Sequence, residues 1–214
     1  MLKQELNILE PLPIGAGGGP IEAQLPVSKF CGLALITEAP RSQDIATGRL
    51  LSGPEGEKLD EMMALAGLDR SACLIAAPFR YQPADDDVAN FFAHEARSRA
   101  EALAVNTKLP PYHGARCVPP HDDDVRALWR LLKQVQPRGI LALGNTALWS
   151  VSWREGVMRF AGQELSTQAC DAGVVPTWHP AHLTRRDDKV DEAIFLAHLK
   201  LAARIAGALP GDTV

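Results

Sequence analysis

Four short runs of hydrophobic residues recur along the chain, and longer stretches with a helical spacing of hydrophobic positions lie between them. Short runs that are apolar throughout are typical of strands buried on both faces of a sheet. They predict strands at 30–37, 72–77, 139–143 and 173–176. The stretches between and after them predict helices at 54–66, 88–105, 122–136 and 191–206, with a short helix after Gly144-Asn145.

The alternation of strand and helix indicates an α/β protein. We expect a three-layer α/β/α sandwich around a mostly parallel, four-stranded sheet. In such sheets the ligand binds in the crevice at the carboxyl ends of the strands. The site should therefore be built from the polar loops that follow the strands, at 38–53, 77–87, 144–147 and 178–186.

The segment before the first strand has no clear periodicity. Residues 1–29 contain a glycine-rich run from Gly15 to Pro20, which is typical of a flexible loop. We therefore predict an N-terminal arm over 1–29, followed by a single domain over 30–208.

The composition fits one globular domain, since 46% of the 214 residues are hydrophobic and 22% are charged. No apolar run reaches the roughly 20 residues that span a bilayer, and the N-terminus has no signal-peptide core. We therefore expect a soluble, cytoplasmic protein with no membrane contact. The net charge of −4 gives no general support for nucleic-acid binding, which would depend on a local basic patch.

The residues that most often bind metals are scattered. No C-x-x-C pair occurs among Cys31, Cys73, Cys117 and Cys170, so we expect no metal site; a cluster held by all four cysteines is the alternative. Cys31 and Cys73 lie in apolar runs and are predicted to be small buried side chains. The acidic runs at 85–87 and 122–124 are predicted to cap helices or to stay solvated.

Four segments carry more specific motifs. The chain has EAPRSQDIATGRLLSG at 38–53, ILALGNTA at 140–147, VVPTWHPAHL at 174–183 and LKLA at 199–202. In this order they resemble the motifs of the family-4 uracil-DNA glycosylases, over about residues 30–205. The resemblance implies that family's fold and an enzyme that flips a base out of DNA and hydrolyses its N-glycosidic bond.

The resemblance implies catalytic roles for Glu38 and His179. His179 would donate a hydrogen bond to the base carbonyl as negative charge develops there, and Glu38 would orient water and favour the sugar cation. The alternatives are a packed loop histidine and a carboxylate that caps a helix. Leu183 matches the residue that fills the gap left by the flipped base, with an ordinary core leucine as the alternative.

The other expected site residues form two groups. Those expected to line the base pocket are Ala39, Pro40, Leu51, Ala77, Phe79, Gly144 and Asn145. Those expected to contact DNA are Arg49, Arg80, Arg185 and Arg186. The backbone N–H groups at Gly144-Asn145 open a helix and are a further candidate phosphate site.

Several positions depart from the family pattern. Thr37 and Arg41 replace two glycines of the first motif, which limits how closely the backbone approaches a nucleotide. Leu51 replaces the aromatic residue that stacks on uracil. Alanine, at 76 or 77, replaces the asparagine that reads the uracil edge, and Phe79 is a candidate replacement aromatic. The cysteines of the family's iron–sulfur cluster are missing, so no cofactor is expected.

The connection over about 84–121 is longer than in the family and is predicted to be an insertion. It is a candidate lid, DNA-contacting arm or protein-partner surface, and it carries Lys108, Tyr112, His113 and Arg116.

The leading hypothesis is a divergent DNA glycosylase that acts on a uracil-like or modified base, in DNA that is single-stranded or has the base flipped out. The alternative is a non-excising module of the same fold that binds DNA, a modified nucleotide or a protein partner through 84–121. A nucleotide hydrolase is a third hypothesis, but the sequence has neither a P-loop nor a dinucleotide-binding glycine motif.

Overall fold

The computed structural model describes residues 18–93, 109–119, 121–186 and 188–209. Its centre is a five-stranded sheet in the order β2-β1-β5-β7-β6. All neighbours pair in parallel except β6, which runs antiparallel to β7. The strands are β1 (Leu33–Ile36), β2 (Leu74–Ala76), β5 (Gly139–Leu143), β6 (Leu165–Ser166) and β7 (Gly173–Thr177). The expected α/β fold with a mostly parallel sheet is confirmed, and the added strand β6 has only two residues, too few for a hydrophobic run.

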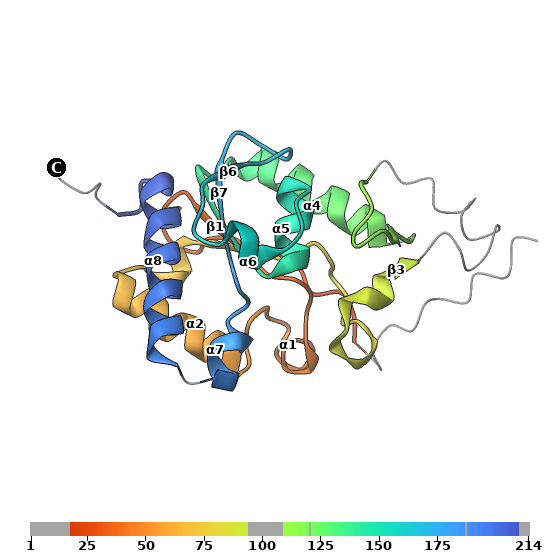
Figure 1. Cartoon of the computed structure of the whole chain (residues 1–214), viewed down its shortest axis with the longest axis horizontal. Helices are drawn as coiled ribbons and strands as arrows, with labels where there is room; N and C mark the ends of the chain where they lie inside the picture. Colours follow the sequence, from red (N-terminus) through yellow and green to blue (C-terminus); the bar gives the residue numbers. More distant parts are fainter. Residues whose placement is uncertain (1–17, 94–108, 120, 187, 210–214) are drawn as a thin grey trace, which may run out of the picture.

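Helices cover both faces of the sheet, as Figure 1 shows. Alternate strand residues such as Leu35 and Leu141 pack on one face against α2 (Pro54–Ala66) and α8 (Lys189–Ala206). Their neighbours, such as Ile140, pack on the other face against α4 (His121–Val135) and α5 (Asn145–Ser152). Because successive side chains of a strand point to opposite faces, strands that are apolar throughout produce the three-layer sandwich.

The long helices begin and end at the signals in the sequence. Pro54 lies in the first turn of α2, and Gly67 follows its last turn with a left-handed φ of 73°. The Asp188 side chain accepts a hydrogen bond from the Val190 N–H and so caps α8, which ends at Gly207. The α8 helix therefore begins at Lys189, slightly before the expected start at 191.

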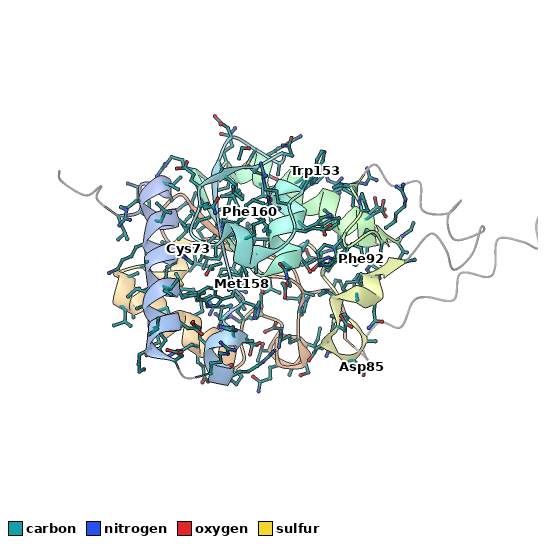
Figure 2. The ribbon with its side chains drawn as sticks, viewed as in Figure 1. Cys73, Asp85, Phe92, Trp153, Met158 and Phe160 are labelled. Carbon is teal, nitrogen blue, oxygen red and sulfur yellow. The ribbon has the colours of Figure 1, made fainter. Side chains whose placement is uncertain are left out.

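The helix expected over 88–105 is wrong at its start, and residues 94–108 lie outside the described part. Residues 84–93 form two 3₁₀ turns and a short strand, η2 (Ala84–Asp86), η3 (Val88–Phe91) and β3 (Phe92–Ala93). The β3 strand pairs antiparallel with β4 (Arg116–Cys117). This extended path brings Phe91 and Phe92 against Phe79 at ring-centroid distances of 4.6 and 5.8 Å; Phe92 is labelled in Figure 2. Aromatic packing thus outweighs the local helical pattern.

This aromatic group belongs to a third hydrophobic cluster beside the sheet. We call it the lateral cluster; its buried members are Ala39, Phe79, Phe91, Leu109, Tyr112, Cys117, Val125 and Trp149. Much of the described part of the predicted insertion is therefore packed against the domain.

The described end of the N-terminal segment lies along the sheet edge. Gln24 and Ile75 exchange backbone hydrogen bonds of 2.8 and 3.0 Å in an isolated antiparallel bridge. Ile21 is buried, whereas Val27 is largely exposed. The segment thus covers part of the open edge of β2, where unpaired backbone groups would otherwise face solvent.

Short helical elements occupy loops for which the sequence predicts no structure. They are α1 (Ser42–Thr47), η1 (Arg70–Ala72), α6 (Val157–Phe160) and α7 (Ala181–Arg186). Within the described residues, no helix has the length and hydrophobicity needed to cross a membrane.

Candidate functional site

Three neighbouring strands bring the principal candidate residues to one edge of the sheet. Glu38 follows β1, Gly144 follows the central strand β5, and His179 follows β7. Because these strands are parallel, their carboxyl ends lie together. A backbone hydrogen bond also joins the ends of β5 and β7, since the Gly144 N–H donates to the Thr177 carbonyl oxygen at 2.9 Å.

Glu38 is fixed to the start of α5. Its Oε1 atom accepts a hydrogen bond from the Thr146 N–H at 3.0 Å. Burial raises the pKa of Glu38, while the hydrogen bonds from Thr146 and the charge of Arg41 act in the opposite direction. Glu38 therefore does cap a helix, and the same contact holds a desolvated carboxyl group at the edge of the sheet.

Gly144 makes room for this carboxyl group. Its φ of 103° lies in a region that L-residues rarely adopt. A Cβ atom at residue 144 would lie 2.6 Å from the Glu38 carboxyl carbon. The first N–H groups at Gly144 and Thr146, near the candidate phosphate site, are already bonded to Thr177 and Glu38.

His179 has a defined tautomer. Its Nδ1 atom lies 3.2 Å from the Ala181 N–H, which can only donate, so Nδ1 is the acceptor. Burial, followed by the charges of Arg41 and Arg185, lowers the pKa of His179 to about 3. The ring is therefore neutral at physiological pH and carries its proton on Nε2.

The Nε2–H group of His179 already has a partner. It lies 3.0 Å from the hydroxyl oxygen of Thr37, which is buried at the end of β1. Thr37 and Arg41 thus both act on His179: Thr37 accepts a hydrogen bond from its Nε2–H, and the charge of Arg41 helps to lower its pKa.

Most of the expected base-pocket residues are buried. Ala39 and Pro40 are buried, and Ala77 is half-buried. Leu51 is 2% exposed with a left-handed φ of 53°, and its carbonyl oxygen accepts from Arg70 at 3.2 Å. The carbonyl of the half-buried Asn145 side chain accepts from the Val157 N–H at 2.6 Å.

Phe79 is fully buried within the lateral cluster, against Phe91. In this conformation its ring is part of the core and offers no free face to a base.

Tyr112, from the predicted insertion, lies beside the site. Its hydroxyl oxygen accepts from the Thr146 hydroxyl at 3.4 Å, and its ring packs 5.7 Å from that of Trp149. Burial raises the pKa of Tyr112, and the charge of Glu38 adds to that shift. The sequence places Tyr112 in the insertion, and no local pattern marks its hydrogen bond with Thr146, which is 34 positions away.

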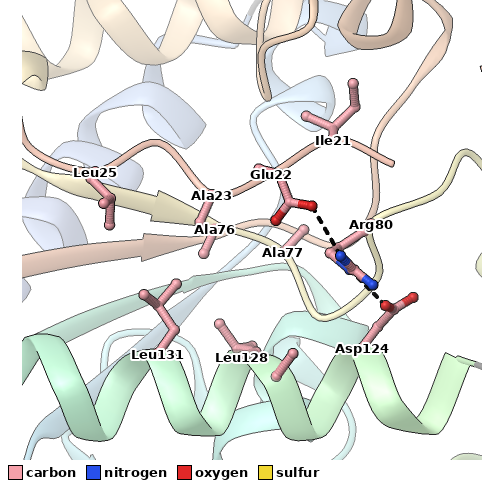
Figure 3. Close-up of a pocket in the computed structure, with 11 residues that line it drawn as sticks. Ile21, Glu22, Ala23, Leu25, Ala76, Ala77, Arg80, Asp124, Leu128 and Leu131 are labelled. Carbon is pink, nitrogen blue, oxygen red and sulfur yellow. Dashed lines mark hydrogen bonds and ion pairs between the residues drawn. The ribbon is translucent and has the colours of Figure 1, made fainter. Parts of the chain in front are cut away.

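The expected DNA-contacting residues differ in their surroundings. Arg49, Arg185 and Arg186 are exposed. Arg80 forms ion pairs of 2.9 Å with Glu22 and 2.8 Å with Asp124 at the rim of a cavity of about 320 Å³, shown in Figure 3. That cavity lies between the N-terminal segment and α4. The two ion pairs at its rim already compensate the Arg80 charge.

Leu183 is 1% exposed and packs in the cluster that α2 and α8 form with the sheet. In this conformation it is a core leucine, and insertion into a duplex would require α7 to move.

The four cysteines do not gather, which contradicts the alternative of one cluster held by all of them. Cys117 is in the lateral cluster, whereas Cys170 packs beside the α4 face of the sheet. Cys31 is half-buried and Cys73 is buried, and their sulfur atoms lie 3.6 Å apart. Across the described ranges, no group of three or more His, Cys, Asp or Glu side chains is arranged to hold a metal ion.

Comparison with known proteins adds one finding. No curated protein matches the chain. A family model described as the uracil DNA glycosylase superfamily matches residues 28–201, which include β1, β5, β7 and the loops after them. Because this match covers most of the sequence, the chain belongs to the uracil DNA glycosylase superfamily.

Proposed function

We propose that this protein is a DNA glycosylase that flips a uracil-like or modified base and hydrolyses its N-glycosidic bond. The observation that carries the proposal is the pair of Glu38 and a neutral His179, at the ends of β1 and β7 in a chain of this superfamily. Superfamily membership suggests glycosylase chemistry on DNA. The likeness to the family-4 type and the identity of the base belong to the proposal.

In the proposed reaction, His179 stabilises the departing base. As the N-glycosidic bond lengthens, negative charge moves onto the base, and the Nε2–H donates to its carbonyl oxygen. With a pKa of about 3, the His179 ring is not an imidazolium at neutral pH and does not transfer a proton to the leaving base. It acts instead as a neutral hydrogen-bond donor. The Ala181 N–H bond to Nδ1 keeps the proton on the other nitrogen throughout.

Glu38 acts on the sugar side. In its ionised form it would favour the positive charge that develops on the sugar and orient the attacking water. The Thr146 N–H holds one carboxyl oxygen at 3.0 Å and so fixes the group at the start of α5. Because the carboxyl group is buried, its ionised form is weakly solvated, which raises its pKa and strengthens its interaction with nearby positive charge.

The Nε2–H of His179 can bond to a base only when it gives up its hydrogen bond to Thr37. A base carbonyl has to take the place of the Thr37 hydroxyl, which accepts from Nε2 at 3.0 Å in the protein alone. Losing one neutral hydrogen bond of this kind costs about 0.5–1.5 kcal/mol. We infer that Thr37 lowers activity on weakly held bases and so contributes to substrate selection.

DNA would be held by exposed cations, which are Arg185 and Arg186 at the end of α7, after His179, and Arg49 farther along the loop after β1. Phosphate contacts of this kind fix the position of the strand without reading its sequence. The ion pairs of Arg80 with Glu22 and Asp124 favour a structural role for that residue instead.

The direct test is base excision by the purified protein. Single- and double-stranded oligonucleotides carrying uracil, hypoxanthine, xanthine or a 5-substituted pyrimidine are incubated with it, and abasic sites are detected by alkaline strand cleavage. We expect product from at least one substrate, and none with the double variant Glu38→Gln/His179→Ala. Failure of the wild-type protein on every substrate would overturn excision as the function.

A second candidate function is a non-excising module that binds DNA or a modified nucleotide. The Thr37 hydroxyl bonded to His179 and the buried ring of Phe79 favour it, because both leave less of the site open to a base. Binding of the same oligonucleotides, measured by fluorescence anisotropy, separates the two functions. A binding module would retain affinity in the double variant and give no abasic product.

A further inference from the structure

A pair of cysteines lies at the opposite end of the sheet from Glu38. Cys31 precedes β1 and Cys73 precedes β2, and the two strands are parallel neighbours. The Cys31 N–H donates to the Ala72 carbonyl at 3.0 Å, so a backbone hydrogen bond joins the two segments just before the paired strands. Figure 2 labels Cys73 and Phe92, which lie well apart in this view.

The sulfur atoms are close enough to react with each other after a small movement. They lie 3.6 Å apart, and neither is in a disulfide. A disulfide has a sulfur–sulfur bond of about 2.05 Å and a Cα separation of about 4.4–6.8 Å. The Cys31 N–H bond to the Ala72 carbonyl holds the two backbones side by side here, where paired strands lie about 4.8 Å apart. Side-chain rotation can then close the remaining gap.

The two thiols are not equivalent. The hydrogen bond from Cys73 lowers the pKa of Cys31 to about 6, and the positive charge of Arg138 adds to the effect. The same contact, with burial, raises the pKa of Cys73 above the usual range. Cys31 is also the less buried of the two. Cys31 is therefore suited to react first, as the thiolate, and Cys73 to react second.

The other two cysteines lack these features. Burial raises the pKa of both Cys117 and Cys170, and each packs in a different hydrophobic cluster. They provide matched controls within the same chain.

We propose that Cys31 and Cys73 form a modification site for peroxides, at which the two thiols are oxidised to an intramolecular disulfide. The Cys31 thiolate attacks one peroxide oxygen, the O–O bond breaks, and hydroxide leaves and takes up a proton, which gives a sulfenic acid on Cys31. The Cys73 sulfur then attacks the Cys31 sulfur, the S–O bond breaks, and water leaves. In total, two thiols and one hydrogen peroxide give one disulfide and two waters.

This disulfide would close the chain into a loop from residue 31 to residue 73. That loop contains β1, Glu38 and α2, so oxidation would tie together both ends of the segment that carries the catalytic carboxyl group. A crosslink of this length restricts the unfolded chain, so the oxidised protein should melt at a higher temperature than the reduced protein.

The test uses the full chain, reduced and then treated with hydrogen peroxide. We expect the free thiols, counted in denaturant, to fall from four to two. After tryptic digestion without reductant, mass spectrometry should find peptide 30–41 joined to peptide 71–80, two hydrogens lighter than the sum of the free peptides. Retention of four thiols, or a link that involves Cys117, Cys170 or a second chain, would overturn the proposal.

Variants separate the two steps. Cys31→Ser should slow peroxide-dependent thiol loss by at least about ten-fold, since it removes the low-pKa thiol. Cys73→Ser should leave a sulfenic acid on residue 31 that a dimedone probe labels. Cys170→Ser should form the disulfide as the wild-type protein does. Circular dichroism spectra of the reduced variants check that all are folded, and equal rates in Cys31→Ser and Cys170→Ser would contradict the assignment.

Discussion

The carboxyl edge of the sheet has two regions that differ in polarity. One contains Glu38 and His179, whose side chains are each held by a backbone N–H group, at 3.0 and 3.2 Å. The other consists of the apolar residues Leu51 and Phe79, which pack in two different hydrophobic clusters and are at most 2% exposed. The first region has groups suited to breaking a glycosidic bond, whereas the second is part of the core. In the proposed function, bond cleavage and base recognition depend on different loops, so a change in one loop can leave the other intact.

The largest expected effect concerns the second region. Phe79→Ala should lower the free energy of unfolding by about 3–5 kcal/mol, because it empties a fully buried aromatic position. Urea denaturation followed by circular dichroism measures the change. Phe160→Ala, at a half-buried ring, is the matched control and should lose less. A loss below about 1 kcal/mol for Phe79→Ala, with a large loss of activity or DNA binding, would instead assign Phe79 to the base pocket.

In the first region, His179→Ala should lower kcat for excision by about 10²–10³-fold, the usual effect of removing one donor to a developing anion. Single-turnover kinetics on the best substrate measures it. His182→Ala is the control, since His182 pairs with Asp191 at 2.9 Å on the neighbouring helices. Similar losses in both variants would indicate a structural effect of the loop and would argue against a donor role for His179.

Glu38→Gln should lower kcat by roughly 10²-fold while preserving the hydrogen bond from Thr146. Because burial raises the pKa of Glu38, wild-type activity should fall on acidification, and this fall should begin at a pH above the ordinary pKa of a glutamate. The glutamine variant should lack that acid limb. An acid limb that persists in Glu38→Gln would assign it to another group.

The same substitution, which lowers kcat, should increase the stability of the fold at neutral pH. A raised pKa means that the folded protein holds the Glu38 proton more tightly than the unfolded chain does, so the stabilisation is present at low pH and is lost as pH rises through the folded pKa. Glu38→Gln should therefore raise Tm by about 2 °C or more at pH 7, and the gain should shrink toward pH 4. Thermal melts across this range provide the measurement; a gain that grows on acidification would contradict the buried, proton-binding carboxyl.

The smallest expected effect tests the Thr37 hydroxyl, which accepts a hydrogen bond from His179. Thr37→Val keeps the side-chain shape and frees the His179 Nε2–H, so excision should rise by up to about ten-fold. Thr177→Val is a close control, because it removes another buried threonine–histidine hydrogen bond, to His198 at 3.1 Å. A fall in activity with Thr37→Val alone would mean that Thr37 orients His179 and does not compete with the base.

The elements of the sheet were predictable from the sequence because each strand is a continuous apolar run. The four predicted strands and the helices α2, α4 and α8 are present, with ends that differ by only a few residues. Local patterns failed where distant contacts decide the structure. The helix predicted from residue 88 gives way to the packing of Phe91 on Phe79, and β6 is too short to produce a pattern.

The candidate site was predictable in part. Motif position was enough to expect Glu38 and His179 on the same edge of the sheet, and the structure brings their strands together on either side of β5. The sequence could not reveal that Thr37 bonds to His179 across 142 positions, or that Tyr112 approaches α5. It also left Leu183 open between two roles, because an apolar side chain near a helix start is equally suited to a core and to a wedge.

Gly144 has a consequence for how sequences of this kind can change. The residue has no functional group, yet a single methyl carbon there would meet the Glu38 carboxyl group at 2.6 Å. Positions 38 and 144 therefore depend on each other: a side chain at 144 would displace the Glu38 carboxyl group, so glutamate at 38 requires glycine at 144. Variant libraries that seek activity on other bases should keep Glu38 and Gly144 and randomise position 37. Loss of the Thr37 hydroxyl changes the hydrogen bonding of His179 without moving Glu38.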